Sequence, residues 1–475
     1  MKVEVEQVEL YEAEADLAVI GLVEGGELPP ALAEAPGAET AKSGFKKLSL
    51  LRQEGFPEVV VVGLGGRDEL DAERLRVAAA LAAKEAGRME AASVAWELPE
   101  VAGPTAAAEA VVTGTILAAY RFDRFKAGEE DDPPRLRSLT LLGPAAVADA
   151  AASARTAAEA QNRARDLQST PANFATPSFL AGRAEEIAAA SDALEAEVLG
   201  RSELEEIGMG GLLAVGQGSA EEPKLVVLRY AGGGSGRKLA FVGKGVTFDT
   251  GGISLKPGAG MQEMKMDMSG GAAVLESVAA IAELGLPLDL IALVPTTENM
   301  PSGTAIKPGD VITQYDGKTV EVNNTDAEGR LILADALAYA VEQGAERIVD
   351  IATLTGAVEI ALGSTYAGLV SNDDDLAAAV SRAGEETGEL VWRLPLHPEY
   401  RELMKGTVAD LSNLARKRKA GTITAASFLE EFVGDTPWAH LDVAGTSWDV
   451  GREYVGNDAS GFGVRLLIEL ARQLT

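Results

Sequence analysis

Two kinds of segment alternate along the chain, namely short runs of apolar residues and longer alanine-rich stretches. The runs Ala18–Val23 and Val59–Gly63 are nearly all apolar, which is typical of strands that are covered on both faces of a sheet. The alanine-rich stretches at 71–87 and 104–119 have high helix propensity and predict helices. Gly63–Gly66 lacks the full dinucleotide-binding fingerprint, so we interpret it as a plain turn. The alternation predicts an α/β fold with a mainly parallel sheet.

The second half of the chain continues this pattern. Asp316-Gly317 lies between two β-rich runs and predicts a hairpin, whose loop Lys318 lengthens. Further strands are predicted at Leu239–Val242, Leu288–Val294, Ile348–Ile351 and Ala439–Val443. Further helices are predicted at Ser269–Leu284, Gly329–Gln343, Thr422–Val433 and Phe462–Leu474.

One stretch divides the chain into two parts. Glu129–Pro134 is acidic and contains proline, so it is predicted to be a solvated loop. A strand at Leu139–Leu142 and a long helical stretch from about Ala145 to Leu167 follow it. We therefore expect a smaller N-terminal α/β domain over 1–145, a linker helix over 146–168, and a larger C-terminal α/β domain with a central mixed sheet over 169–475.

The charge and the apolar runs exclude several functional classes. The 475 residues include 42 Lys plus Arg and 73 Asp plus Glu, which gives a formal net charge of −31. Such a surface repels nucleic-acid phosphates and anionic lipid, so neither is an expected partner. The acidic start does not resemble a secretory signal, and no apolar run approaches the roughly 20 residues of a membrane helix. We expect a cytoplasmic protein.

The lack of cysteine and the scarcity of histidine restrict the possible metal chemistry. Without cysteine, the chain has no disulfides, thiolate metal sites or cysteine nucleophiles. Its two histidines, His397 and His440, lie far apart and do not form the paired motif of helical zinc sites. Each is expected to be structural. Any metal centre must therefore be built from carboxylates, carbonyls or lysine.

Charged residues gather in two segments whose surroundings are apolar. The first segment supplies Lys244, Asp249, Lys256 and Asp267, and the second supplies Asp326, Glu328 and Arg330. Lys244 follows a predicted buried strand, and Asp249 is expected on a turn that two glycines keep tight. In open α/β sheets, ligands bind at the carboxyl ends of the strands. The two segments are therefore candidates for one site.

Two interpretations of these side chains are open. Asp326 alone is typical of a helix N-cap, and Glu328 of a favourable first-turn charge. Four carboxylates at one sheet edge, however, repel one another unless cations neutralise them, and hard divalent ions suit such a set. Lys244 could pair with the acids or bind a metal as a neutral amine. Lys256 and Arg330 could stabilise an oxyanion or hold a small anion that acts as a base.

A longer motif points to a family. Asn324-Thr325-Asp326-Ala327-Glu328-Gly329-Arg330-Leu331 resembles the signature octapeptide of the leucine aminopeptidases, the cytosolic M17 metallopeptidases. Lys244–Gly252 together with Lys256 is similar to the other metal segment of that family. Further family-like blocks lie at Gly208–Ser219, Ala352–Gly356 and Trp438–Thr446, with a weaker one at Tyr120–Asp123. The resemblance is clear over about residues 160–475.

The resemblance implies a leucyl aminopeptidase with a macro-like N-terminal domain, a C-terminal catalytic metallopeptidase domain and two divalent metal ions. Asp249 and Glu328 are implied to bridge the two ions. Lys244 and Asp267 would complete one metal site, and Asp326 would complete the other with its side chain and backbone carbonyl. Mn²⁺ or Zn²⁺ is the expected metal, with Co²⁺ or Mg²⁺ as alternatives.

The same resemblance implies the catalytic and substrate-binding roles. Lys256 would polarise the scissile carbonyl, and Arg330 would hold a bicarbonate ion that takes a proton from the metal-bridging water. The expected substrate-binding residues are Met264, Thr353, Leu354, Gly356 and Ala444. Their size suits an apolar N-terminal residue such as Leu or Met, although core packing explains Met264 almost as well.

Three alternatives stay open beside this interpretation. A DNA-binding role, which some bacterial relatives have, is disfavoured by the net charge. The only compact basic run is Arg416–Lys419, where relatives usually carry glycines, and we interpret it as a solvated or subunit-contact loop. A dipeptidase for Cys-Gly-type peptides would use the same site, and an inactive homologue is disfavoured because each expected site residue is present. The resemblance also implies a homohexamer that acts on peptides.

Overall fold

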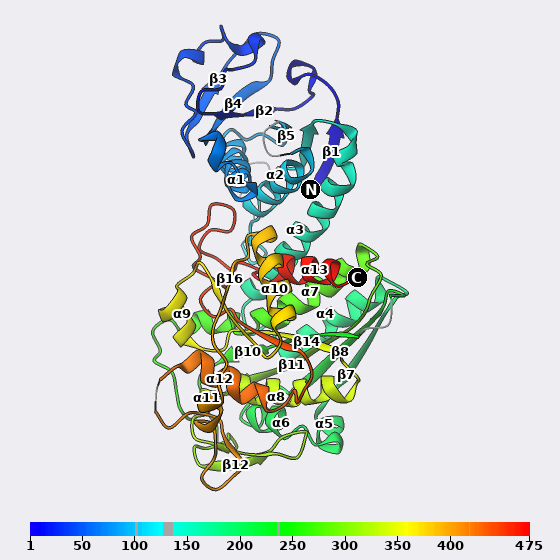
Figure 1. The fold of residues 1–475 in the computed structure, drawn as a ribbon, viewed down its shortest axis with the longest axis vertical. Helices are drawn as coiled ribbons and strands as arrows, with labels where there is room; N and C mark the ends of the chain where they lie inside the picture. Colours follow the sequence, from blue (N-terminus) through cyan, green and yellow to red (C-terminus); the bar gives the residue numbers. More distant parts are fainter. Residues whose placement is uncertain (100–102, 127–135, 235–237, 418) are drawn as a thin grey trace. The chain divides into compact units, whose positions relative to one another are not determined.

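The computed structural model describes residues 1–99, 103–126, 136–234, 238–417 and 419–475, and it forms two compact units (Figure 1). One unit comprises Met1–Asn162 with Gly451–Asn457, and the other comprises Arg163–Val450 with Asp458–Thr475. The boundary between them falls within helix α3 (Ala148–Ser169). The predicted fold, a smaller N-terminal α/β unit and a larger C-terminal unit with a mixed sheet, is confirmed. The acidic stretch Glu129–Pro134 lies outside the described residues.

The N-terminal unit is built on a six-stranded sheet in the order β1-β6-β5-β2-β4-β3. Its strands are β1 (Lys2–Glu6), β2 (Leu17–Val23), β3 (Leu48–Leu51), β4 (Glu58–Gly65), β5 (Ser93–Glu97) and β6 (Ser138–Leu142). Neighbours are parallel except at the edge strand β3, which is antiparallel to β4. The apolar strands β2 and β4 are buried along almost their whole length, as their composition predicts. Helices α1 (Ala72–Arg88) and α2 (Pro104–Ala118) pack against each other.

The interpretation of Gly63–Gly66 as a plain turn is wrong, because β4 continues through Gly65. A Cβ atom on Gly63 would lie 2.1 Å from the backbone oxygen of Gly44, so no other residue type fits beside that segment. The pairing of β2 with β4 also shifts register between Leu22 and Val23. Gly63 therefore permits a close backbone approach near the end of a strand rather than a turn.

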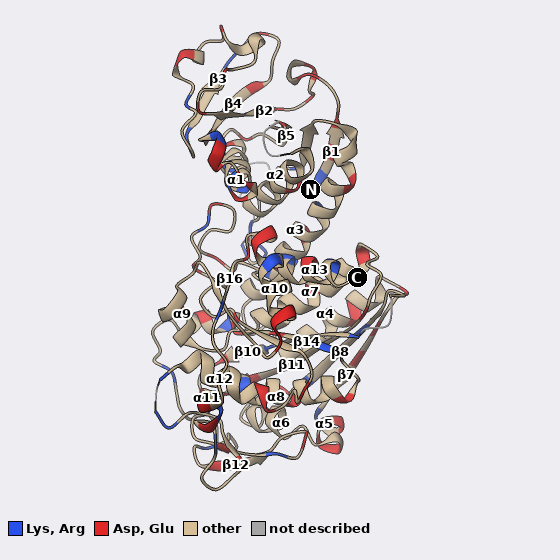
Figure 2. Cartoon of the chain, in the orientation of Figure 1, with Lys and Arg blue, Asp and Glu red and all other residues tan. Residues whose placement is uncertain are grey.

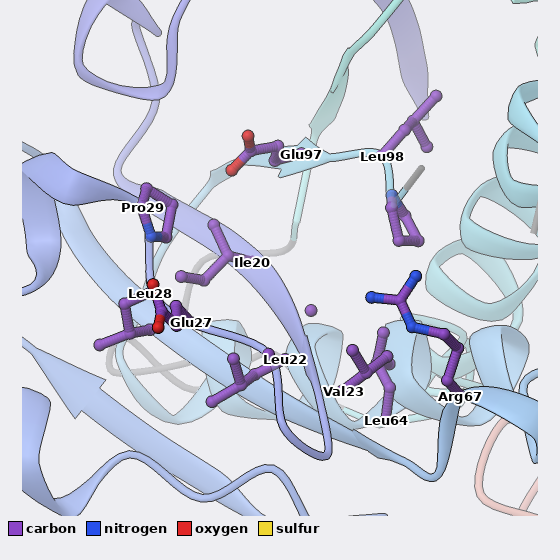
Figure 3. Close-up of a pocket in the computed structure, with 13 residues that line it drawn as sticks. Ile20, Leu22, Val23, Glu27, Leu28, Pro29, Leu64, Arg67, Glu97 and Leu98 are labelled. Carbon is purple, nitrogen blue, oxygen red and sulfur yellow. The ribbon is translucent and has the colours of Figure 1, made fainter. Parts of the chain in front are cut away.

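The carboxyl ends of β2, β4 and β5 border a cavity of about 310 Å³ (Figure 3). The apolar side chains that border it include Ile20, Leu22, Val23, Leu64 and Leu98. Three charged side chains also border it, and Arg67 lies across the cavity from Glu27 and Glu97 (Figure 3). The N-terminal unit thus has a hollow at the sheet edge where α/β folds bind ligands.

The C-terminal unit contains a nine-stranded mixed sheet in the order β16-β15-β18-β14-β9-β11-β8-β7, with β10 paired to β11. The central strands β18 (Trp438–Asp442), β14 (Arg347–Ala352), β9 (Leu239–Gly243) and β11 (Asp289–Asn299) are parallel. The remaining strands are β7 (Leu194–Leu199), β8 (Lys224–Ala231), β10 (Gly245–Asp249), β15 (Ala367–Ser371) and β16 (Val391–Arg393). Of these, β8 and β15 pair antiparallel with the central strands.

Helices cover both faces of this sheet (Figure 1). One face carries α4 (Pro177–Ala189), α7 (Ser269–Glu283), α10 (Asp374–Thr387) and α13 (Val464–Gln473). The other carries α6 (Gly210–Gly216), α8 (Gly329–Glu342) and α12 (Gly421–Glu430), whose apolar residues form one buried core with the sheet. Shorter helices are α5 (Arg201–Ile207), α9 (Gly356–Leu362) and α11 (Pro398–Glu402). Acidic residues are spread over the helices and loops of both units (Figure 2).

A separate three-stranded sheet contains the predicted hairpin. Strands β12 (Asp310–Thr313) and β13 (Thr319–Val322) are antiparallel, and β17 (Leu411–Ser412) pairs with β13. The hairpin prediction is therefore confirmed. Because β13 leads into Asn323 and Asn324, and β17 leads into Asn413, this small sheet brings two loops of the candidate site together.

Candidate metal centre

Six charged side chains meet near the carboxyl ends of the central strands of the C-terminal sheet. Lys244 directly follows β9, and Asp249 is the last residue of β10 rather than part of a turn. Asp267 follows the 3₁₀ segment η7 (Met261–Met266), while Glu328 is the N-cap of α8. Asp326 lies two residues before Glu328, and Lys256 follows the turn after β10. The structure thus brings together the candidate residues of both sequence segments.

Two glycines allow the chain to turn sharply beside Asp249. Gly251 and Gly252 have φ angles of 85° and 63°, which side-chain-bearing residues rarely adopt. A Cβ atom on Gly251 would lie 2.8 Å from Asp326 Oδ1, and one on Gly252 would lie 2.7 Å from Asn299 Oδ1. The turn therefore lets the backbone come close to the acidic side chains.

Lys244 is the centre of the more deeply buried half of the cluster. Its Nζ lies 2.8 Å from a carboxylate oxygen of Asp267, 2.8 Å from Glu328 Oε1 and 2.8 Å from the carbonyl oxygen of Thr353. Burial alone lowers the pKa of Lys244, but the carboxylates of Asp267 and Glu328 outweigh it and raise that pKa above the ordinary value. Thr353 Oγ1 also donates to Asp267 Oδ1 at 2.7 Å.

Lys256 occupies the other half of the cluster. Its Nζ contacts Asp249 Oδ2 and Asp326 Oδ1, and its side chain is 23% exposed. Burial is the largest effect on its pKa and lowers it, yet Glu328 and Asp249 raise that pKa above the ordinary lysine value. Each half of the cluster thus places one lysine amine between two carboxylates.

The donor set fits divalent cations. Asp249, Asp326 and Glu328 each offer an oxygen, and these three oxygens lie within 4.8 Å of one another. Glu328 Oε2 is buried and has no hydrogen-bond partner among the described residues. Burial and the repulsion from Glu328 raise the pKa of Asp249 to about 6, and burial raises the pKa of Asp267 to about 8. Such crowded, desolvated oxygens require positive charge, and hard divalent ions prefer oxygen ligands.

Arg330 lies in the first turn of α8 and is almost fully buried. Its Nη1 donates to the carbonyl oxygen of Asn413 at 2.7 Å, whereas its Nε has no partner within the described part of the chain. Burial lowers the pKa of Arg330 to about 10. A buried guanidinium with a free donor is suited to hold a small anion.

Two asparagines support the site, and the sequence analysis gave them no role. Asn299, at the end of β11, donates from Nδ2 to Asp249 Oδ1 at 2.8 Å and to the Thr325 carbonyl at 3.0 Å. Asn413 donates from Nδ2 to the Asn324 carbonyl at 2.7 Å. Because Asn299 follows Thr296, Thr297 and Glu298 at the end of β11, no local pattern in the sequence distinguishes it.

The expected substrate-binding residues occupy different places. Thr353 and Leu354 directly follow β14, and Gly356 begins α9. A cavity of about 270 Å³ is bordered by Leu354 and Gly356 together with Asp326 and Arg330. Met264, Thr353 and Ala444 are not among the described residues that line this cavity. Met264 lies in η7, and Ala444 lies two residues after β18.

Neither histidine lies in the cluster. His440 is fully buried in β18, where its Nδ1 lies 2.6 Å from Asp350 Oδ1, and His397 is the N-cap of α11.

Every helix among the described residues is too short or too polar to cross a lipid bilayer.

Comparison with known proteins identifies the family. The family model described as "Cytosol aminopeptidase family, catalytic domain" matches residues 162–468, and the model of the family's N-terminal domain matches residues 19–129. The chain therefore belongs to the cytosol aminopeptidase family, whose members are metal-dependent aminopeptidases. The predicted resemblance is confirmed.

Individual relatives cover nearly the whole chain. A probable cytosol aminopeptidase of Geobacter sp. (strain M21) is 48% identical over 91% of this chain and 89% of its own length. One of Roseiflexus castenholzii is 46% identical over 97% of this chain and 96% of its own length. The solved bottromycin maturation enzyme BotP, in complex with Mn, is 37% identical with a TM-score of 0.89, covering 97% of this chain and 100% of BotP.

Proposed function

We propose that this chain is a two-metal aminopeptidase that removes an apolar N-terminal residue, such as Leu or Met, from peptides. The observation that carries the proposal is the buried cluster, in which oxygens of Asp249, Asp326 and Glu328 lie within 4.8 Å of one another beside two lysines. Membership of an aminopeptidase family supports the reaction class, and the Mn complex of BotP supports a metal at this kind of site.

The cluster supplies the residues that would hold two divalent ions. Asp249 and Glu328 would be shared between the ions, with Lys244 and Asp267 completing one site and Asp326 the other. Bound metals of this kind polarise a carbonyl and lower the pKa of water. For Lys244 to act as a ligand, it must lose one of the three ammonium protons that it now donates to Asp267, Glu328 and the Thr353 carbonyl. Mn²⁺ or Zn²⁺ is the proposed metal, with Co²⁺ or Mg²⁺ as alternatives.

Two cationic side chains would act in catalysis, one on the substrate carbonyl and the other on the general base. Lys256 would stabilise the negative charge that develops on the carbonyl oxygen, because its amine lies among the carboxylates at the less buried end of the cluster. Arg330 would hold a bicarbonate ion as general base, since its Nε lacks a partner among the described residues and the side chain borders the cavity. Asn413 would orient Arg330 through the 2.7 Å hydrogen bond to Nη1.

Metal removal and replacement test this function directly. Chelator-treated protein should lose hydrolysis of a leucyl chromogenic substrate, and Mn²⁺, Zn²⁺ or Co²⁺ should restore it, because the crowded carboxylates need divalent cations to organise the site. A panel of aminoacyl substrates, measured with each metal in turn, would define the preferred N-terminal residue. Full activity in protein that elemental analysis shows to be metal-free would refute the proposal. Peptides are the proposed substrates, and a homohexamer remains the assembly predicted from the resemblance.

A further inference from the structure

Two lysines of the basic run, Lys417 and Lys419, reach the candidate site. Lys417 and Lys419 border the same cavity of about 270 Å³ as Asp326 and Arg330. This location was not expected from the sequence, which suggested a solvated or subunit-contact loop. The loop therefore contributes charge to the space in which a substrate would lie.

The side chains of these two lysines are available to a ligand. Both residues are exposed, and neither has an ion-pair partner among the residues that the structure describes, whereas the neighbouring Arg416 donates to Thr407 Oγ1 at 2.5 Å. The chain as a whole is acidic, with 73 acidic and 42 basic residues. Two unpaired lysines beside one cavity leave a local positive charge on an acidic protein.

The cavity is electrically asymmetric. Among the described residues, one carboxylate, that of Asp326, and three cations, Arg330, Lys417 and Lys419, border it, whereas Asp249, Asp267 and Glu328 do not. A peptide carries a positive α-amine at its N-terminus, which the carboxylates of the buried cluster attract. A peptide that extends from that cluster into the cavity therefore runs from negative to positive surroundings.

We propose that Lys417 and Lys419 form an anion subsite that recognises a carboxylate on the part of the substrate beyond its N-terminal residue. This inference rests on the proposed aminopeptidase function and adds a substrate class to it. The carboxylate can be an acidic side chain in the second position or the C-terminus of a very short peptide, since both present the same group.

Matched peptides separate the two sources of the carboxylate. Leu-Asp-amide against Leu-Asn-amide tests the side chain, and Leu-Gly against Leu-Gly-amide tests the C-terminus. The metal-loaded enzyme should favour the acidic member of at least one pair in kcat/KM by roughly threefold to tenfold, the range that one or two partly exposed ion pairs provide. This preference should fall as ionic strength rises, because salt screens exposed charges.

The double variant Lys417→Gln/Lys419→Gln should bring the ratio close to one. The matched control Lys42→Gln/Lys47→Gln removes two exposed lysines from the N-terminal unit and should keep the wild-type ratio. Equal cleavage of both members of both pairs by the wild type, or a salt-independent ratio that the Lys417→Gln/Lys419→Gln protein retains, would overturn the subsite while leaving the aminopeptidase function intact. No cleavage of any peptide would instead refute the proposed function.

Discussion

Each unit has a region of interest at the carboxyl ends of its strands, a cavity in the N-terminal unit and the buried charged cluster in the C-terminal unit, and the two regions differ in how far their charges are buried. In the N-terminal unit, β2, β4 and β5 end at a cavity whose charged residues Glu27 and Arg67 are exposed. In the C-terminal unit, Lys244, Asp249 and Glu328 are each no more than 3% exposed. The ends of parallel strands therefore provide room for a ligand in both units. A catalytic site also needs charged groups that are shielded from water, and the C-terminal unit has them.

The difference in burial has an energetic consequence. A buried charge is tolerated only when an opposite charge and hydrogen bonds compensate for the lost solvation. In the C-terminal unit, Lys244 is paired with Asp267 and Glu328, while Lys256 is paired with Asp249 and Asp326. Removing one member of the cluster leaves its partners with less compensating charge. The exposed charges around the N-terminal cavity stay in contact with water, so removing one of them has no such cost. Substitutions in the two regions should therefore have very different effects.

The largest expected effect follows from removing a shared carboxylate. Asp249→Ala and Glu328→Ala should each lose bound metal and peptidase activity together, because each would remove a ligand of both ions and one of the two carboxylates that compensate a buried lysine. Breaking a buried pair of this kind costs about 3–5 kcal/mol. Elemental analysis and kcat, measured on the same preparations, check the prediction. A variant that retained two metals and wild-type kcat would contradict the assignment of that residue.

The next effect separates metal binding from catalysis. Lys256→Ala should keep both metals but lose kcat by roughly a hundred- to thousand-fold, the usual loss of about 2.7–4 kcal/mol when a donor to a developing oxyanion is removed. The loss should fall on kcat more than on KM, because the charge develops only in the transition state. Near wild-type kcat with both metals bound would show that Lys256 does not stabilise that charge.

Arg330→Ala should have a smaller effect than Lys256→Ala. Its proposed role is to hold a bicarbonate ion, so added bicarbonate or another small base should restore part of the lost rate. Lys256→Ala provides the matched control, because an external base cannot replace a fixed positive charge at the carbonyl oxygen. Rates measured across a bicarbonate titration check the prediction. Equal rescue of both variants, or of neither, would argue against the bicarbonate role.

Much of the site could be predicted because its charges are crowded in sequence. Asp326, Glu328 and Arg330 lie within five residues, before and at the start of a helix. A structural role such as helix capping explains one of these charges but not all three. The supporting asparagines could not be predicted in the same way. Asn299 and Asp249 are 50 residues apart, and their contact depends on the parallel pairing of β10 with the end of β11.

The parts of the fold that the sequence analysis missed depend on tertiary contacts. Strand β10 has only five residues between Lys244 and the glycine turn, so its sequence alone gives a weak indication of a strand. Its pairing with β11, which local sequence does not reveal, defines it as one. The end of β4 was interpreted as a turn because its glycines lack the full dinucleotide-binding fingerprint, but a close approach of the Gly44 backbone requires Gly63 there. The position of Lys417 and Lys419 beside the cavity likewise follows from how their loop is folded, which a run of basic residues does not reveal.

The smallest expected effect is in the N-terminal cavity. Arg67→Ala and Glu27→Ala remove exposed charges from a hollow that contains no member of the buried cluster, so each variant should keep its metals and its kcat/KM on leucyl substrates. Their free energies of unfolding should stay within about 0.5 kcal/mol of the wild-type value, as is usual for surface substitutions. Denaturant unfolding and steady-state kinetics on the same preparations check both expectations. A large loss of activity in either variant would mean that the N-terminal cavity influences catalysis, and that burial of charge does not by itself distinguish the two regions.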